Sequence, residues 1–100
     1  MSYREVLKYL IQNNALKVMN QLSFDKPSTK DAVAVLKGLK AESALVVLPQ
    51  DNTNAKLSFR NVKDVKVINE SNINVYDFLL YPSVIVTQEF FGNLKERYSL

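Results

Sequence analysis

The chain has neither cysteine nor histidine among its 100 residues. Without cysteine it cannot form a disulfide framework or use a thiol nucleophile, and without both residue types it lacks the usual ligands of zinc and haem iron. Catalytic triads that depend on histidine are excluded for the same reason. We therefore expect a protein without a metal, without another cofactor and without enzymatic activity.

Glycine and long apolar runs are also scarce. The two glycines cannot form a GxGxxG or a GxxxxGK(S/T) sequence, so we expect neither dinucleotide binding nor nucleotide hydrolysis. No apolar run approaches the roughly 20 residues that span a bilayer, and the N-terminus lacks the apolar core of a signal peptide. The lack of a spanning segment predicts no membrane partner, and the lack of cysteine fits an intracellular protein best.

Positive charge is present and is unevenly distributed. The first 40 residues contain seven Lys or Arg and three Asp or Glu, whereas the remaining residues contain six and seven, for a formal net charge of +3. An excess of cations in one region favours a polyanionic partner on that side, although a solvated lysine-rich face gives the same pattern. The charge alone therefore leaves nucleic-acid binding open.

Local patterns predict five helices and four strands in strict alternation. Residues whose side-chain oxygens can cap a helix mark the helix starts: Ser2, Ser28, Asp51 or Asn52, Asn74 and Thr87. The predicted strands are residues 15–24, 44–48, 65–68 and 83–86. Two of the helices are expected to be short, ending near residues 61 and 80.

The alternation of elements predicts an α/β fold. The continuous apolar run at 44–48 is typical of a central parallel strand that is covered on both faces, and residues 83–86 are predicted to be another buried strand. We therefore predict a single α/β domain over residues 1–100, with a small, open, mainly parallel four-stranded sheet and helices on both faces. Right-handed crossovers are expected to join the strands, and a partner segment is expected to complete the sheet.

In an open parallel sheet, ligands bind beyond the carboxyl ends of the strands. Asp51 follows a predicted central strand, where a phosphoacceptor or a magnesium ligand would lie, but it also suits a helix cap or a solvated turn. The sequence places no second carboxylate next to it, which favours the cap. The alternative to a binding module is a small flavodoxin-like domain that acts as an enzyme subunit or phosphocarrier. Such a domain needs a reactive residue at a strand end, and only Asp51 is a candidate.

A second candidate site is a polar and basic cluster at the start of the helix that follows the first strand. Its members are Lys26, Ser28, Thr29 and Lys30. A helix N-terminus offers free N–H groups and partial positive charge, both of which suit a phosphate. Lys37 lies seven residues after Lys30 on the same helix face, and Lys40 follows, so the cluster extends into a basic ridge. An ordinary solvated face remains the alternative interpretation.

A third candidate site is Arg60, Asn61 and Lys63 at the end of the next helix. Arginine offers a planar fork of donors for phosphates, and asparagine can both donate and accept hydrogen bonds. A helix C-terminal cation at Arg60 and a C-cap at Asn61 are the structural alternatives.

Several segments in order carry a resemblance to a known family. They are residues 27–30 (PSTK), 44–48 (ALVVL), 57–62 (LSFRNV), 65–67 (VKV), 74–79 (NVYDFL) and 84–87 (VIVT). This order resembles ribosomal protein four of the large subunit in its bacterial and organellar form. The resemblance covers essentially the whole chain, except that Phe59 replaces the small residue usual between Ser58 and Arg60, so we expect different local packing there.

The resemblance implies a structural protein that binds large-subunit ribosomal RNA, contacts neighbouring ribosomal proteins and supports subunit assembly. It implies a location in the ribosome, in a mitochondrion, a plastid or the bacterial cytoplasm. It also favours the interpretation of the two basic sites as RNA contacts. The family is about twice as long, and the chain resembles only the second half of its globular domain. We expect a separate chain to supply the first half, unless the sequence is a fragment.

Overall fold

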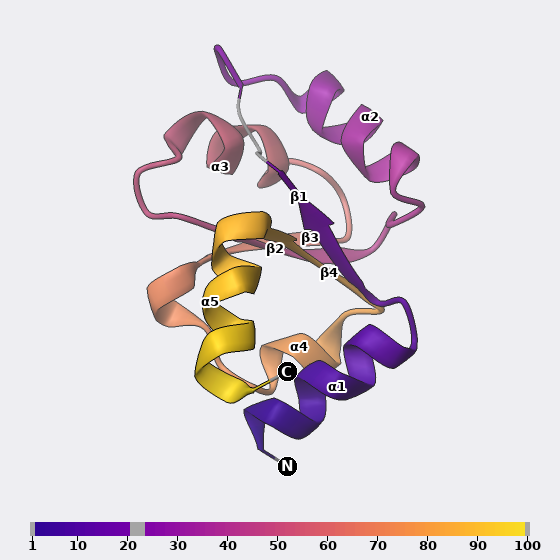
Figure 1. The fold of residues 1–100 in the computed structure, drawn as a ribbon. Coiled ribbons are helices and arrows are strands. Elements are labelled where there is room, and N and C mark those ends of the chain that lie inside the picture. The colour runs from indigo at the N-terminus through magenta and orange to yellow at the C-terminus, as the bar shows by residue number, and fades with distance from the viewer. Residues whose placement is uncertain (1, 21–23, 100) are drawn as a thin grey trace.

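The computed structural model describes residues 2–20 and 24–99, and within them helices and strands alternate (Figure 1). The α-helices are α1 (Tyr3–Gln12), α2 (Thr29–Gly38), α3 (Thr53–Phe59), α4 (Asp77–Leu80) and α5 (Gln88–Tyr98). The strands are β1 (Leu16–Met19), β2 (Ala44–Leu48), β3 (Val65–Asn69) and β4 (Ser83–Thr87). A short 3-10 helix, η1 (Glu70–Asn72), follows β3.

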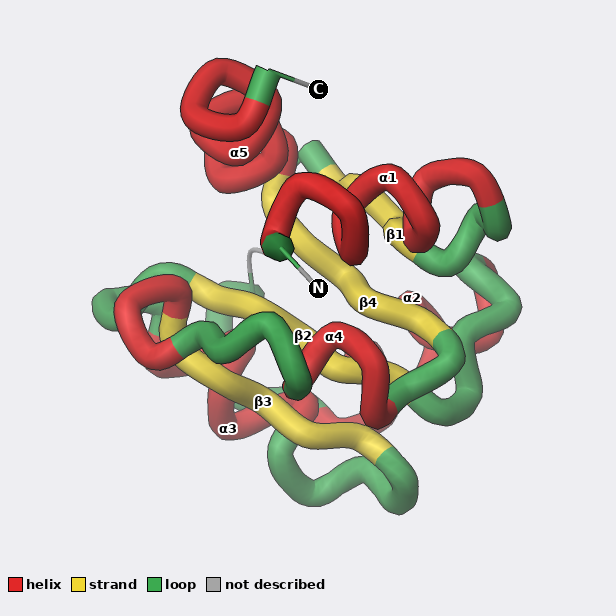
Figure 2. Tube along the Cα trace, turned by 90° about the horizontal axis from the view of Figure 1, so that it is seen from below, coloured by secondary structure: helices red, strands yellow, loops and turns green. Residues whose placement is uncertain are grey.

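The four strands form one parallel sheet in the order β1-β4-β2-β3. Figure 2 shows α1 and α4 in front of the strands, with α2 and α3 behind them. The crossovers through α2 and α3 run toward β3, and the crossover through α4 runs back to β4. A constant hand of crossover therefore places α4 on the opposite face from α2 and α3. The predicted fold class is confirmed.

The core lies on both sides of the two central strands. Every residue of β2 and β4 is buried, which confirms the buried strands predicted at 44–48 and 83–86. Val46 and Ile85 pack toward α2 and α3, whereas Leu45 and Val84 pack toward α1, α4 and α5. Neighbouring residues in a strand point to opposite faces, so each central strand contributes to both halves of the core.

Most predicted helix caps are present as hydrogen bonds from a backbone N–H to a side-chain oxygen. The pairs are Glu5 to Ser2 (3.3 Å), Asp31 to Ser28 (3.2 Å), Ala55 to Asn52 (3.3 Å) and Phe90 to Thr87 (3.2 Å). Each satisfies one of the N–H groups that a helix start leaves without an intrahelical partner. Asn52 therefore caps α3, and Asp51 lies in the turn before it.

The predicted cap at Asn74 is wrong. Its side chain accepts a hydrogen bond from the Tyr76 N–H at 3.0 Å, and its own N–H donates to Asp77 Oδ2 at 3.3 Å. This local turn competes with the helix, so α4 begins at Asp77.

Two predicted boundaries also differ. The strand predicted at 15–24 ends at Met19, Leu22 lies outside the described residues, and Phe24 is not in a strand. The helix predicted to reach residue 61 ends at Phe59, with Arg60 as its C-cap.

Candidate nucleic-acid interface

Helices α2 and α3 lie side by side on one face of the sheet (Figure 1) and carry exposed cations. We call these cations and those that flank them the α2–α3 basic surface: Lys26, Lys30, Lys37, Lys40, Lys56, Arg60 and Lys63. Among the residues that the structure describes, one ion pair lies within salt-bridge distance. It joins Lys66 to Asp77 at 3.9 Å, and neither residue belongs to the basic surface. The basic surface is thus not neutralised by carboxylates at that range.

Sequence reasoning missed Lys56. It lies four residues before Arg60, so the two side chains share one face of α3. This four-residue spacing is the sequence signal from which Lys56 could have been predicted. Lys56 and Arg60 are exposed, and α3 contacts α2, the helix that carries Lys30 and Lys37.

The polar candidates occupy the ends of the same two helices. Ser28 is part-buried and caps α2, whereas Thr29 is the exposed first residue of that helix. Asn61 is exposed in the turn after α3, next to Lys63. The structure therefore places the second and third candidate sites at the ends of two helices that contact each other on one face of the sheet.

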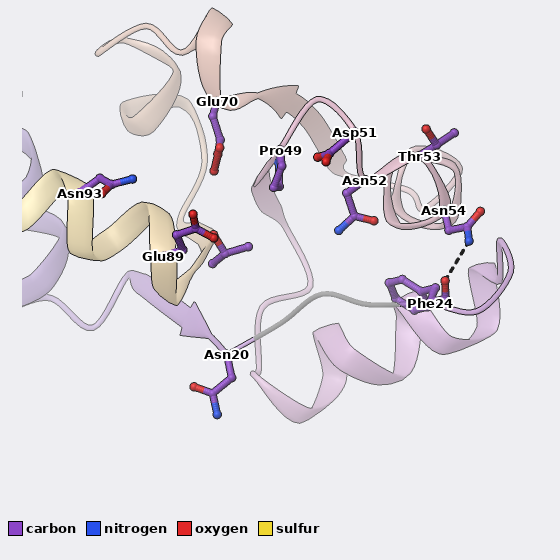
Figure 3. Close-up of a pocket in the computed structure, with 11 residues that line it drawn as sticks. Asn20, Phe24, Pro49, Asp51, Asn52, Thr53, Asn54, Glu70, Glu89 and Asn93 are labelled. Atoms are coloured by element: carbon purple, nitrogen blue, oxygen red, sulfur yellow. Dashed lines mark hydrogen bonds between the residues drawn. The ribbon is translucent and has the colours of Figure 1, made fainter.

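A fully buried serine joins the two helices. Ser58 Oγ accepts a hydrogen bond from the Ser28 N–H at 2.7 Å and donates to the Asn54 carbonyl oxygen at 2.7 Å. The Asn54 side-chain amide in turn donates to the carbonyl oxygen of Phe24 at 2.9 Å (Figure 3) and to that of Asp25 at 3.2 Å. These bonds attach the turn that precedes α2 to the side of α3.

An aromatic pair supports the same junction. Phe59 is fully buried, and its ring meets that of Phe24 edge-on, with centroids 5.7 Å apart. A small residue at position 59 would leave the Phe24 ring without this partner. Phe59, the large residue in the segment 57–62, thus packs against Phe24, which precedes α2.

The carboxyl ends of the strands form a pocket of about 690 Å³ (Figure 3). Asp51 lines it together with Glu70 and Glu89, so the expectation that Asp51 has no carboxylate neighbour is wrong. Parallel strands end at one edge of a sheet, which is why acids remote in sequence meet there. Burial raises the pKa of Glu70, and the negative charges of Glu89 and Asp51 raise it further.

The chemistry of this pocket is poorly suited to phosphate, because its charged lining residues are acidic. Within residues 2–20 and 24–99, no three acidic, His or Cys side chains are grouped so as to hold a metal ion. The Asp51 carbonyl oxygen accepts a hydrogen bond from the Thr53 N–H at 3.0 Å, as expected of a turn residue.

The opposite face of the sheet has an apolar groove of about 440 Å³ between α1 and α4. Tyr9, Leu79 and Leu80 line it and are 53%, 44% and 69% exposed. We call it the α1–α4 groove. No helix in the described ranges has the length and apolarity needed to cross a bilayer.

The open parallel sheet and the exposed cations of α2 and α3 define a basic α/β fold. A family model described as Ribosomal protein L4/L1 family matches residues 1–97. The chain belongs to this family, which confirms the resemblance of its ordered segments.

Individual relatives agree. The chain is 42% identical to the large ribosomal subunit protein uL4 of Geotalea uraniireducens over 85 residues, which are 85% of this chain and 41% of that protein. It is 34% identical to the protein of the same name from Clostridium beijerinckii over 96 residues, 96% of this chain and 47% of the relative. The chain thus spans less than half the length of these relatives.

Proposed function

We propose that this chain is a structural constituent of the large ribosomal subunit and binds its ribosomal RNA through the α2–α3 basic surface. The observation that carries the proposal is the set of exposed cations on two adjacent helices, in a member of the ribosomal protein L4/L1 family. The role is one of binding and assembly rather than catalysis. Its location is the ribosome of a bacterium or of a bacterial-type organelle.

The cations act mainly on the RNA backbone. Lys30, Lys37 and Lys40 lie on phosphates as point charges, which fixes the position of the protein without reading base sequence. The guanidinium of Arg60 forks onto a phosphate with two parallel hydrogen bonds. Thr29 and Asn61 offer neutral donors and acceptors to phosphate oxygens or ribose hydroxyls at the edges of the surface.

Further partners cover the other face of the domain. The α1–α4 groove exposes aliphatic and aromatic side chains that a neighbouring ribosomal protein, or a separate chain carrying the first half of the family sequence, would bury. In that arrangement residues 1–100 act as one α/β domain, and the partner provides the remainder of the family fold.

The test is RNA binding at several salt concentrations. Replacing Lys30 and Lys37 with Ala should lower the slope of log affinity against log salt by about one to two units. Replacing Lys8 and Lys95 with Ala is the matched control, because it removes the same charge from helices on the opposite face. The proposal fails if both double variants change the slope equally, or if the unmodified protein shows no salt-dependent binding.

A further inference from the structure

The cations of the α2–α3 basic surface come from two segments far apart in the chain. Ser28 and Ser58, which hydrogen-bond to each other where these segments meet, are 30 residues apart. Lys26 lies in the turn before α2, and Lys56 and Arg60 lie on α3. Their relative spacing therefore depends on the contacts that attach this turn to α3.

We infer that Ser58 and Asn54 are positioning residues for RNA binding. They fix Lys26 and Lys30 relative to Lys56 and Arg60, so that the two groups contact the phosphate backbone as one rigid surface. This inference rests on the proposed function and deepens it. Neither Ser58 nor Asn54 needs to touch the RNA.

The geometry around Ser58 supports this role. Its side chain is completely buried, so water does not compete for the hydroxyl. The hydroxyl is both acceptor and donor, with the Ser28 N–H and the Asn54 carbonyl oxygen each at 2.7 Å. Ser28 is also the N-cap of α2, so the bond from its N–H attaches the beginning of that helix, and hence Lys30, to α3.

Asn54 fixes the preceding part of the turn. Its amide donates to two successive carbonyl oxygens, those of Phe24 and Asp25, immediately before Lys26. Two bonds from one planar amide restrict both position and orientation of the backbone. The edge-on contact between Phe24 and Phe59 supports the same turn from its apolar side.

A fixed turn matters because phosphates are spaced along the RNA by its helical geometry. If the turn were free, ordering Lys26 and Lys30 on binding would cost conformational entropy and weaken each contact. Because Ser58 and Asn54 order the turn when the protein folds, this entropy is not lost again on binding. We therefore expect that replacing the uncharged side chains of Ser58 and Asn54 changes the salt dependence of RNA affinity.

The experiment uses the 100-residue chain and large-subunit ribosomal RNA transcribed from a bacterial relative. Affinity is measured at about 50 and about 200 mM salt, an interval over which each phosphate contact accounts for about a threefold loss. The variants are Ser58→Ala and Asn54→Ala. Val84→Ala is the control, because it removes buried methyl groups from the opposite half of the core.

We expect both test variants to lose less affinity over this salt interval than the unmodified protein, by about tenfold if the contacts of Lys26 and Lys30 are lost. Adding Lys30→Ala should then reduce the salt-induced loss of affinity of Asn54→Ala less than twofold, although it reduces that of the unmodified protein about threefold. Val84→Ala should keep the salt dependence of the unmodified protein. Asn54 is part-exposed, so its variant serves if Ser58→Ala does not fold.

Two outcomes would overturn the inference. If Ser58→Ala and Asn54→Ala keep the full salt dependence, or if Lys30→Ala is equally damaging in both backgrounds, these residues only stabilise the fold. In either case the proposed function survives, because the unmodified protein still binds. If the unmodified protein shows no salt-dependent binding, the proposed function and the inference fail together.

Discussion

The hydroxyl of Tyr3 donates a hydrogen bond of 3.0 Å to the carbonyl oxygen of Ile73, 70 residues away. The Tyr3 ring also stacks on Tyr98, with centroids 5.6 Å apart, and meets Phe78 edge-on at 6.2 Å. The first turn of α1 thereby contacts the segment before α4 and the last turn of α5. One side chain thus joins three parts of the chain on the face opposite the basic surface.

Tyr3→Phe should lower the free energy of unfolding by about 1 kcal/mol at pH 7, because the Ile73 carbonyl oxygen loses its donor. Burial, followed by the nearby Tyr98 and Asp77, raises the pKa of Tyr3 above its ordinary 10.0. The native state therefore favours the protonated phenol, whose stabilising effect is present below pH 10.0 and is lost as pH rises through the raised pKa. Urea unfolding at pH 7 and above pH 10.0 checks this, and a pH-independent difference would contradict it.

Glu70→Gln should stabilise the protein at neutral pH, by no more than the about 0.5 kcal/mol usual for surface substitutions. Because burial and then Glu89 and Asp51 raise its pKa above 4.5, the contribution of Glu70 to stability is present below pH 4.5 and is lost as pH rises. The advantage of the variant should therefore disappear in acid. Thermal melting at pH 4 and pH 7 measures it, with Glu42→Gln as an exposed control outside the pocket.

Lys40 has a backbone φ of 54°, in the left-handed region that glycine prefers. It follows α2 at the position where Schellman motifs usually have glycine, with the Ala41 N–H bonded to the Leu36 carbonyl oxygen at 2.9 Å. Lys40→Gly should raise the free energy of unfolding by about 0.5 to 1 kcal/mol and lower the salt slope of RNA binding by about one unit.

Asp64→Gly is the matched control for Lys40→Gly. Asp64 has a similar φ of 63°, but its side chain is an anion and cannot bind phosphate. It should gain comparable stability without any weakening of RNA binding. If Lys40→Gly stabilises the chain and binds RNA normally, Lys40 is not part of the interface.

Arg60→Ala should reduce incorporation into the large subunit far more than it reduces stability. Arg60 is exposed at the end of α3, so its loss should change the free energy of unfolding by only about 0.5 kcal/mol. Recovery of the variant in assembled particles and its melting temperature should be measured side by side, with Lys8→Ala as a control on α1. A sharp fall in melting temperature with normal assembly would show that Arg60 is structural.

The α1–α4 groove predicts that the isolated chain associates with itself or with other apolar surfaces. Leu80→Gln should reduce this association, measured by sedimentation over a range of concentrations. Tyr76→Gln is the control, because Tyr76 is equally exposed, at 69%, but does not line the groove. A monomeric chain with stability near 10 kcal/mol at all concentrations would contradict the need for a partner.

Features that depend on neighbouring residues could be predicted from the sequence. Ala44–Leu48 is apolar at every position and Ser83–Thr87 at its three central positions, which is typical of a strand covered on both faces. The caps at Ser28 and Thr87 act on N–H groups three residues away, so their chemistry is local. At Asn74 two local structures compete, and the sequence pattern did not show that the turn displaces the helix start.

The sequence by itself determined the alternating α/β architecture and the basic character of the segments that became α2 and α3. Only the tertiary structure decided which charges lie together. Parallel strands ending at one edge bring Glu70 and Glu89 into one pocket with Asp51, and the packing of α3 beside α2 brings the exposed Lys56 to the same face of the sheet as Lys30 and Lys37. Ser58 is the clearest case, because its burial and its bond to Ser28 depend on a contact between residues 30 apart, which no local pattern encodes.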